Sequence, residues 1–428
     1  MKIRFYNVKL MTMEDGTGIL PQGEVWVDGG KILYSGPGET SPDSGQYAWD
    51  RQIDGQGNLL MPGFKDAHTH SAMTFLRSYA DDLPLLEWLN HQVFPMEAKL
   101  SGNDVYDLCK LAILEYLTSG ITANFDMYMH PEQIARASAD MGFRTVIAGG
   151  LNDFTSSLEE TEEAYVKLNE YHPLIRYCLG FHAEYTTSRS LLEGVASLSH
   201  KYHAPVFTHN SESQSEVEQC LKRTGMTPTV YLDHLGLFDY GGGGYHCIHM
   251  SEEDLEIFRE KGLYAVTNPA SNLKLASGIA PVSRMMEMGI GLAIGTDGPA
   301  SNNCLDMFRE MFLTTGLAKL REQDASAVDA GCVLEMACVG GARAMGLTDC
   351  DSLAKGKRAD LILIDLHRPN MQPENHIGKN LVYSGSKDNV KLTMIEGKIL
   401  YENGLFFVDE DPEEIYGKAN EIIGRCRS

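Results

Sequence analysis

The chain has 428 residues, 43% of them apolar, and its 59 acidic residues outnumber its 36 basic residues to give a formal net charge of −23. This composition excludes wholesale disorder, and the acidic balance disfavours binding to nucleic acids or to anionic membranes. No stretch approaches the roughly 18 to 20 apolar residues of a membrane-spanning helix, and the first residues lack the apolar core of a signal peptide. We therefore expect a cytoplasmic protein.

Both ends of the chain predict β-strands. Near the N-terminus, short alternating or apolar runs bounded by turn residues lie at 3–11, 24–27, 31–34 and 52–54. Similar runs near the C-terminus lie at 359–365, 390–395 and 398–401. Two β-rich ends around a different middle predict a small β-sandwich domain built from residues 1–60 and 351–428.

The middle of the chain, residues 61–350, alternates apolar runs with helical patterns, which is typical of parallel strands joined by helices. The predicted strands are 63–70, 121–128, 143–149, 177–184, 205–212, 245–249, 264–268 and 291–297. Two intervening helices begin with outlines of capping boxes, at Ser101 to Asp104 and at Ser251 to Asp254. Eight such units predict an α/β fold with a (β/α)8 TIM barrel, whose chemistry lies at the carboxyl ends of the strands.

Several predicted strands end in side chains that bind metals. His68 and His70 alternate along the first strand and therefore project to the same face. Alone, this pair is weak evidence, but His209 and Asp297 lie at the ends of the fifth and eighth strands. Three imidazoles and one carboxylate suit a borderline ion such as zinc, with one position left for water. We therefore predict a metal site at the barrel rim.

Two further residues are candidates for proton transfer. Glu212 follows His209 by three residues, where the chain leaves the strand, so its carboxyl could carry a proton to a substrate. The alternative is that Glu212 caps the helix expected to begin near residues 213–216. His246 and His249 lie close together, and only one of them can face inward. A core histidine bonded to the backbone is the alternative for either one.

Six stretches carry a resemblance to a known family: 61–70 (MPGFKDAHTH), 79–89 (YADDLPLLEWL), 94–97 (FPME), 246–249 (HCIH), 268–275 (NPASNLKL) and 295–303 (GTDGPASNN). With these stretches the chain resembles the amidohydrolase superfamily, and within it the branch of 5′-methylthioadenosine/S-adenosylhomocysteine deaminases and chlorohydrolase-like proteins. The resemblance covers nearly the whole chain. It implies a hydrolase that acts on C–N bonds in cyclic amidines and releases ammonia from an adenosine-type nucleoside.

The resemblance also implies roles for individual residues. It assigns four ligands to one divalent ion per chain, with Zn²⁺ as the expected metal: His68, His70, His209 and Asp297. His246 and Asp297 would orient and deprotonate the attacking water, and Glu212 would protonate N1 of the purine and shuttle protons. Relatives with two metals usually have a carboxylated lysine on the fourth strand. This chain has His182 there, which favours a single ion.

The substrate contacts implied by the resemblance are Trp88, Glu97, His182, Glu212 and His246. Trp88 would border the pocket, Glu97 would accept hydrogen bonds from the two ribose hydroxyls, and His182 would contact the nucleoside. A carboxylate suits a cis-diol because it can accept both protons. The alternatives are packing for Trp88 and surface solvation for Glu97.

The chain departs from relatives that act on S-adenosylhomocysteine. Those relatives have two arginines that bind the amino-acid carboxylate, but the aligned positions here are Gly149 or Gly150 and Ser157. We therefore expect a neutral substrate such as 5′-methylthioadenosine or adenosine, with S-adenosylhomocysteine as a weaker candidate. An extra carboxylate at Glu184 would also disfavour an anionic tail, although a surface role is equally consistent with the sequence.

Alternatives remain open at this point. The same machinery could act on another ring, such as guanine, a pterin, cytosine or a triazine, or the chain could be a non-catalytic scaffold. By analogy with other barrels we expect a homo-oligomer. The run of four glycines at 241–244, which the sequence places just before the sixth strand, could be a lid hinge or a tight entry to that strand.

Overall fold

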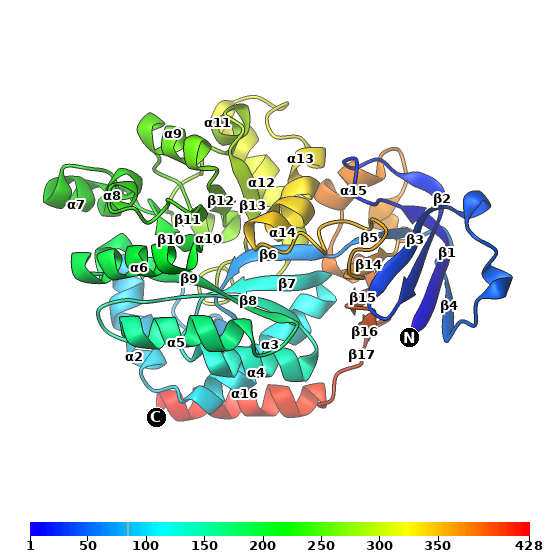
Figure 1. Ribbon diagram of the computed structural model, residues 1–428, viewed down its shortest axis with the longest axis horizontal. Coiled ribbons are helices and arrows are strands. Elements are labelled where there is room, and N and C mark those ends of the chain that lie inside the picture. The colour runs from blue at the N-terminus through cyan, green and yellow to red at the C-terminus, as the bar shows by residue number, and fades with distance from the viewer. Residues whose placement is uncertain (84) are drawn as a thin grey trace.

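A computed structural model describes residues 1–83 and 85–428, so Pro84, in the quoted stretch 79–89, lies outside the described residues. Its centre is a barrel of eight parallel strands that follow one another in chain order (Figure 1). The strands are β6 (Phe64–Thr69), β7 (Ile121–Asp126), β8 (Arg144–Ala148), β9 (Ile175–Ala183), β10 (Val206–Asn210), β11 (Gly242–His246), β12 (Tyr264–Thr267) and β13 (Gly291–Ile294). The predicted (β/α)8 barrel is confirmed.

The first and last barrel strands meet at the rim. The backbone N–H of Asp297 donates to the carbonyl oxygen of His68 over 2.9 Å. Beside this bond, the Asp66 carboxylate accepts from the backbone N–H of Thr296 at 2.8 Å and from its hydroxyl at 2.6 Å. Burial raises the pKa of Asp66 to about 7. These contacts bring the two ends of the barrel segment together, although 230 residues separate Asp66 from Thr296.

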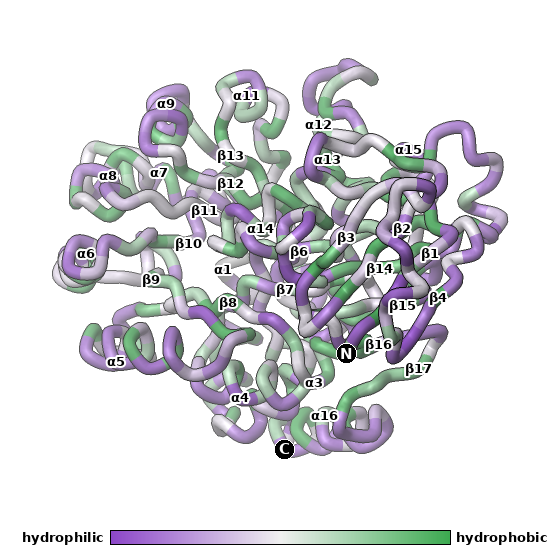
Figure 2. The backbone as a smooth tube through the Cα atoms, turned by 45° about the vertical axis from the view of Figure 1, so that its right-hand side comes forward, coloured by the Kyte–Doolittle hydropathy of each residue, from purple (hydrophilic) through white to green (hydrophobic). Residues whose placement is uncertain are grey.

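Helices surround the barrel, and several begin where the sequence predicts. The capping boxes at Ser101 and Ser251 are both formed, since each serine accepts from the backbone N–H three residues on. Helix α9, on the outside, is largely hydrophilic, whereas β14 is apolar (Figure 2). The helices are α1 (Leu85–Trp88), α2 (Phe94–Glu97), α3 (Gly102–Thr118), α4 (Pro131–Met141), α5 (Leu158–Asn169), α6 (Arg189–Tyr202), α7 (Gln214–Thr224), α8 (Pro228–His234), α9 (Glu252–Lys261), α10 (Pro269–Lys274), α11 (Val282–Glu287), α12 (Met307–Glu322), α13 (Ala330–Glu335), α14 (Gly341–Ala344), α15 (Ile377–Tyr383) and α16 (Pro412–Arg427).

Both chain ends contribute to one nine-stranded mixed sheet beside the barrel, as the sequence predicts (Figure 1). Its strands are β1 (Lys2–Leu10), β2 (Leu20–Asp28), β3 (Lys31–Pro37), β4 (Arg51–Asp54), β5 (Leu59–Pro62), β14 (Leu361–Ile364), β15 (Val390–Ile395), β16 (Lys398–Glu402) and β17 (Leu405–Phe406). The prediction did not include β5, which pairs with β14 and β1 and thereby joins the two halves. This strand runs across the domain boundary expected at residue 60.

The glycine run at 241–244 is not an entry segment, and its predicted position before the strand is wrong. Gly242 to Gly244 are the first part of β11 itself. A Cβ on Gly242 would lie 1.9 Å from the carbonyl oxygen of Val206, and one on Gly243 would lie 2.2 Å from that of Tyr264. The φ of Gly242 is +125°, which other residues rarely adopt. The glycines are therefore needed because neighbouring strands approach closely.

The sheet and the barrel meet through both apolar and ionic contacts. Ile362 of β14 and Val390 of β15 belong to the same apolar cluster as Phe64 of β6. Nearby, Arg144 at the start of β8 donates two hydrogen bonds to Asp360, at 2.7 and 3.1 Å. Among the residues that the structure describes, no helix has the length and apolar character needed to cross a membrane.

Candidate metal centre and active site

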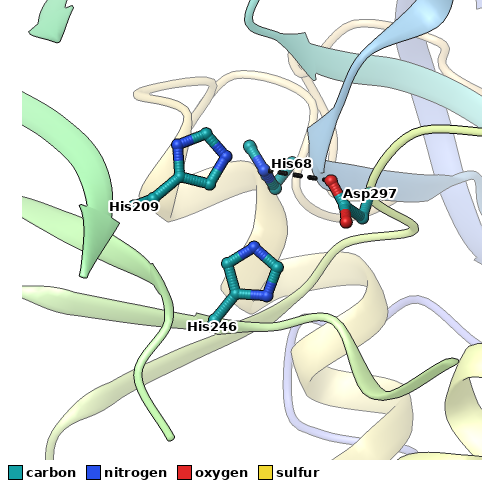
Figure 3. A group of neighbouring side chains, drawn as sticks. All are labelled: His68, His209, His246 and Asp297. Carbon is teal, nitrogen blue, oxygen red and sulfur yellow. Dashed lines mark ion pairs between the residues drawn. The ribbon is translucent and has the colours of Figure 1, made fainter. Parts of the chain in front are cut away.

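Four side chains from four separate strand ends gather at the rim. Their candidate ligand atoms all lie within 4.8 Å of one another (Figure 3). His68 comes from β6, His209 from β10 and His246 from β11, while Asp297 follows β13. All four are buried. The barrel therefore brings together residues that are spread over some 230 positions of the chain, because the carboxyl ends of parallel strands share one face.

His70 lies against this group, as expected. Its Nε2 is 3.1 Å from Oδ1 of Asp297 and 3.4 Å from Nε2 of His209. The Nδ1 atoms point away from the centre: that of His70 lies 2.5 Å from the carbonyl oxygen of Met127, and that of His209 lies 2.7 Å from the carbonyl oxygen of His182. A carbonyl oxygen only accepts, so each Nδ1 carries a hydrogen and donates it. Both rings therefore direct Nε2 toward the centre.

The pKa shifts at the site have identifiable causes. Burial lowers the pKa of His68 to about 3 and holds that of His209 well below its ordinary value. Burial also lowers the pKa of His70, but the hydrogen bond and charge of Asp297 outweigh this effect and raise it to about 9. Burial raises the pKa of Asp297, yet its contacts with His68 and His70 lower it overall. Asp297 is therefore ionised beside neutral His68 and His209, which is the state that a metal requires of these ligands. His70, with its raised pKa, has to release a proton before it can act as a ligand.

The residues fit a divalent ion. His68 is fully buried, and neither of its ring nitrogens forms a hydrogen bond, although Nε2 lies 3.5 Å from Oδ1 of Asp297. Buried polar atoms normally have a partner, so an unbonded imidazole facing a carboxylate points to a ligand. Imidazole nitrogens with one carboxylate oxygen are typical ligands of Zn²⁺. The four predicted ligands lie together, with His246 beside them.

Glu212 lies at the edge of the cluster, and its capping alternative is excluded. Its Oε2 is 3.8 Å from Nε2 of His246. Burial raises the pKa of its carboxyl. Ser213, not Glu212, caps α7, in a capping box with Glu216. The Glu216 carboxylate also accepts from the backbone N–H of Glu212 at 2.8 Å, which holds the chain at that point.

The choice between His246, the last residue of β11, and His249, which follows the strand, is also resolved. His246 faces the cluster, with its ring centroid 5.5 Å from that of His209. His249 points elsewhere, and its Nε2 lies 2.8 Å from the carbonyl oxygen of Ser277. His249 therefore has the backbone-bonded role that was the alternative for either residue.

The three other predicted substrate contacts, His182, Glu97 and Trp88, lie in different surroundings. The ring centroid of His182 is 4.9 Å from that of His209, and burial lowers the pKa of His182 to about 4. Glu97 of α2 is buried, and its pKa is raised to about 7 by burial, against the effects of Tyr128 and the charge of His70. Trp88 is buried in the apolar cluster that also contains Met73. The structure thus brings His182 and Glu97 close to the imidazoles, and the substrate-binding roles of His182, Glu97 and Trp88 all stay predictions.

Some residues that hold the site were missed from the sequence. The hydroxyl of Ser301 donates to Oδ2 of Asp297 at 2.7 Å, and Ser301 lies within the quoted stretch 295–303. Asp126 ends β7 and accepts from the backbone N–H of Ser71 at 3.0 Å. Its position at the carboxyl end of a predicted barrel strand was the signal that could have identified it.

Glu184 does not add an unpaired negative charge to the rim. Its carboxylate is buried and accepts two hydrogen bonds from Arg223 of α7, at 2.8 and 2.6 Å. The expectation that Glu184 repels an anionic substrate therefore loses its basis, because a bidentate guanidinium balances the carboxylate. The preference for a neutral substrate then depends on the missing arginines alone.

The fold and the site define the class of protein: a (β/α)8 barrel enzyme with a cluster of histidines and an aspartate that could hold a metal ion at the carboxyl ends of its strands. The chain belongs to the amidohydrolase family, whose model matches residues 59–400. The matched region begins with β5 and ends in β16, so it includes the whole barrel.

Similar proteins align with most of this chain. A 5-methylthioadenosine/S-adenosylhomocysteine deaminase of Thermoanaerobacter pseudethanolicus is 37% identical over 94% of each chain. A 5′-deoxyadenosine deaminase of Methanothermobacter thermautotrophicus is 38% identical over 85% of this chain and 86% of its own. The crystal structure of an adenosine deaminase from Xanthomonas campestris with bound zinc superimposes with a TM-score of 0.94, at 33% identity over 99% of this chain and 98% of that one.

Proposed function

We propose that the protein is a metal-dependent deaminase that hydrolyses the 6-amino group of adenosine-type nucleosides to give the inosine analogue and ammonia. The observation that carries this proposal is Glu212, a buried carboxylate with a raised pKa that lies 3.8 Å from His246 beside the imidazole and Asp297 cluster. The relatives named for 5-methylthioadenosine, S-adenosylhomocysteine, 5′-deoxyadenosine and adenosine support this substrate class.

One divalent ion per chain, Zn²⁺ as in the Xanthomonas relative, completes the proposed site. The proposed ligands are His68, His70, His209 and Asp297. When bound, the ion supplies Lewis acidity, which makes water nucleophilic near neutral pH. His246 lies beside this set and is proposed to orient the water rather than to act as a ligand.

The remaining chemistry belongs to the side chains. Glu212 in its protonated form donates to N1 of the purine, which makes C6 electrophilic; its raised pKa favours that form. Asp297 accepts a proton from the attacking water, whose oxygen forms the new bond to C6. Glu212, now ionised, accepts the proton of the new hydroxyl group on C6 and passes it to the amino nitrogen; the bond from C6 to this nitrogen breaks, ammonia leaves and a carbonyl group remains at C6. The proton held by Asp297 then returns to Glu212, which restores both side chains.

Substrate selection follows from the nucleoside-binding residues. We propose that Glu97 accepts hydrogen bonds from the ribose hydroxyls and that the 5′ substituent is neutral. A Cβ on Gly149 would lie 2.9 Å from the carbonyl oxygen of Gly180, so the backbone leaves no room for an arginine there. Ser157 caps α5 instead of binding a carboxylate. 5′-Methylthioadenosine and adenosine are therefore proposed as better substrates than S-adenosylhomocysteine.

A screen of ammonia release tests this proposal. The compounds are adenosine, 5′-methylthioadenosine, 5′-deoxyadenosine, S-adenosylhomocysteine, guanine and a triazine, each with zinc-loaded protein. We expect the highest kcat/KM with the neutral adenosine derivatives. A strong preference for S-adenosylhomocysteine would overturn the specificity argument, and turnover of guanine or the triazine alone would overturn the nucleoside assignment.

A further inference from the structure

A short segment beside the site, residues 269–277, contacts each of the three residues proposed to handle protons. It consists of α10 and the turn that follows, within and just beyond the quoted stretch 268–275. The three contacts are Ser271 Oγ donating to Asp297 Oδ2 at 2.5 Å, Asn272 Oδ1 lying 2.7 Å from His246 Nδ1, and Ser277 Oγ donating to Glu212 Oε1 at 3.5 Å. Ser271, Asn272 and Ser277 themselves have no role in the chemistry proposed above.

The contact between Asn272 and His246 determines where the imidazole carries its hydrogen. Both residues are 1% exposed, so water does not compete for this bond. An amide oxygen can only accept, and therefore Nδ1 of His246 must donate. The neutral ring then has its lone pair on Nε2, the atom that lies 3.8 Å from Oε2 of Glu212.

The backbone of His246 has a strained conformation, so a fixed hydrogen-bond partner such as Asn272 helps to hold the residue in place. Its φ is +69°, in the left-handed region that a non-glycine residue adopts at a cost. Asn272 is itself well fixed. Its backbone N–H donates to the carbonyl oxygen of Asn268 at 2.9 Å, and its own carbonyl oxygen accepts from the N–H of Ser277 at 2.9 Å. A residue held in this way can set the direction of the ring.

We propose that Asn272 is a positioning residue for deamination, which fixes the tautomer and orientation of His246 so that an unprotonated Nε2 faces the reacting water and Glu212. The proposal rests on the proposed function. In this proposal the segment 269–277 aligns the proton-handling groups, and Asn272 is its principal residue. Loss of this alignment slows the chemical step more than it weakens substrate binding.

Two variants separate positioning from packing. Asn272→Leu keeps the approximate volume but removes the acceptor, whereas Asn272→Asp keeps an acceptor and adds a buried charge. We expect Asn272→Leu to lower kcat by about tenfold or more, with KM changed by less than about threefold and zinc content unchanged. We expect Asn272→Asp to retain more of kcat than Asn272→Leu. A purely space-filling role predicts the opposite order, because only the aspartate buries a charge.

A spectroscopic readout does not depend on activity. In ¹⁵N-histidine NMR of the zinc-loaded full chain, which has 14 histidines, the His246→Gln spectrum identifies the signals of His246. We expect the hydrogen on Nδ1 in the parent and in Asn272→Asp, and loss of this fixed state in Asn272→Leu. A hydrogen on Nε2 in the parent, or a parental kcat in Asn272→Leu, would overturn the proposal.

The matched control is Asn169→Leu at the end of α5. Asn169 makes hydrogen bonds to the backbone of Tyr165 and Tyr177, but it contacts none of the proton-handling groups. We expect it to lower thermal stability without changing kcat. If the parent deaminates no nucleoside, the proposed function fails while the NMR experiment still tests Asn272. If the parent is active and Asn272→Leu matches it, only the present inference fails.

Discussion

The junction between barrel and sheet and the rim of the barrel both bury ionisable groups, but only the junction pairs them fully within the chain. Where the barrel meets the sheet, Asp360 accepts two hydrogen bonds from Arg144 and a third, at 2.8 Å, from the backbone N–H of Glu396. At the rim, both ring nitrogens of buried His68 lack hydrogen bonds, and burial raises the pKa of Glu212. The junction is electrostatically satisfied within the chain, whereas the rim is not.

The backbone at the rim is strained as well, but a left-handed φ is not confined to it, since Glu396 at the junction has a φ of +49°. Ser211, His246 and Asp297, all at the rim, have φ values of +52°, +69° and +58°. Such conformations cost free energy and persist only where surrounding contacts hold them. The unbonded ring nitrogens of His68 therefore mark the rim as a site for a ligand, whereas the fully paired Asp360 serves to hold the sheet against the barrel. Five experiments test this distinction.

Removal of the metal should have the largest effect. Chelation should reduce deaminase activity to background, and added Zn²⁺ should restore it, because both ring nitrogens of buried His68 lack any other partner. Thermal stability should fall as well, by about 3 kcal/mol if the ion had been present at 100 times its Kd. In the control variant His209→Ala, zinc should no longer change the melting temperature. Full activity in protein shown by elemental analysis to be metal-free would contradict the metal centre.

Glu212→Gln should have the next largest effect. The amide keeps the size of the side chain but cannot transfer a proton, so kcat should fall by about 10²- to 10⁴-fold. Folding should be retained, since the substitution removes a carboxyl whose charge is disfavoured by burial. Steady-state kinetics, melting temperature and zinc content are the measurements. An unchanged kcat with full zinc content would exclude Glu212 as the proton carrier.

Arg144→Met should affect stability and leave the chemistry intact. Removing the guanidinium leaves Asp360 buried without its charged partner, which should cost about 3 to 5 kcal/mol of unfolding free energy. Urea denaturation measures this loss. The matched control is Arg189→Met, which breaks the exposed ion pair with Glu193 and should cost less than about 1 kcal/mol. A kcat that fell in proportion to the stability loss would contradict the separation of the two regions.

The effect of Arg144→Met should also depend on pH. Burial raises the pKa of Asp360, but the charge and hydrogen bonds of Arg144 outweigh this effect and hold it below the ordinary value of 3.8. A depressed folded-state pKa contributes stability above the unfolded-state pKa, and this contribution is lost as the pH falls through the folded-state value. The difference between parent and variant should therefore be fully present at neutral pH and shrink below about pH 4. A difference that grew with acidity would contradict this.

Glu97→Ala should have the smallest and most selective effect. If Glu97 binds the ribose hydroxyls, its loss should lower kcat/KM for adenosine by about 10- to 100-fold, the value of one charged hydrogen bond. Any turnover of adenine, which has no ribose, should change much less. Equal losses with both compounds would assign Glu97 to the packing of the site, where it lies buried close to His70.

Much of the fold could be predicted because the barrel strands are short apolar runs between recognisable turns and caps. Ser101 and Ser251 mark helix starts through local bonds, which sequence spacing reveals. The sequence could not place the glycines of β11 correctly. Glycine is needed there because the backbones of Val206 and Tyr264 approach closely from neighbouring strands. Strand β5 was missed because its pairing partner β14 lies some 300 residues away.

The sequence by itself determined the residue types at the rim, since alternation along a strand and the strand ends in chain order are local properties. It predicted His68, His70, His209 and Asp297 as rim residues without any three-dimensional information. The family resemblance already favoured His246 over His249, and only the tertiary structure decided that Arg223 neutralises Glu184 and that Asn272 faces His246. These outcomes depend on which atoms of distant segments lie within hydrogen-bond distance, and no local pattern encodes that distance.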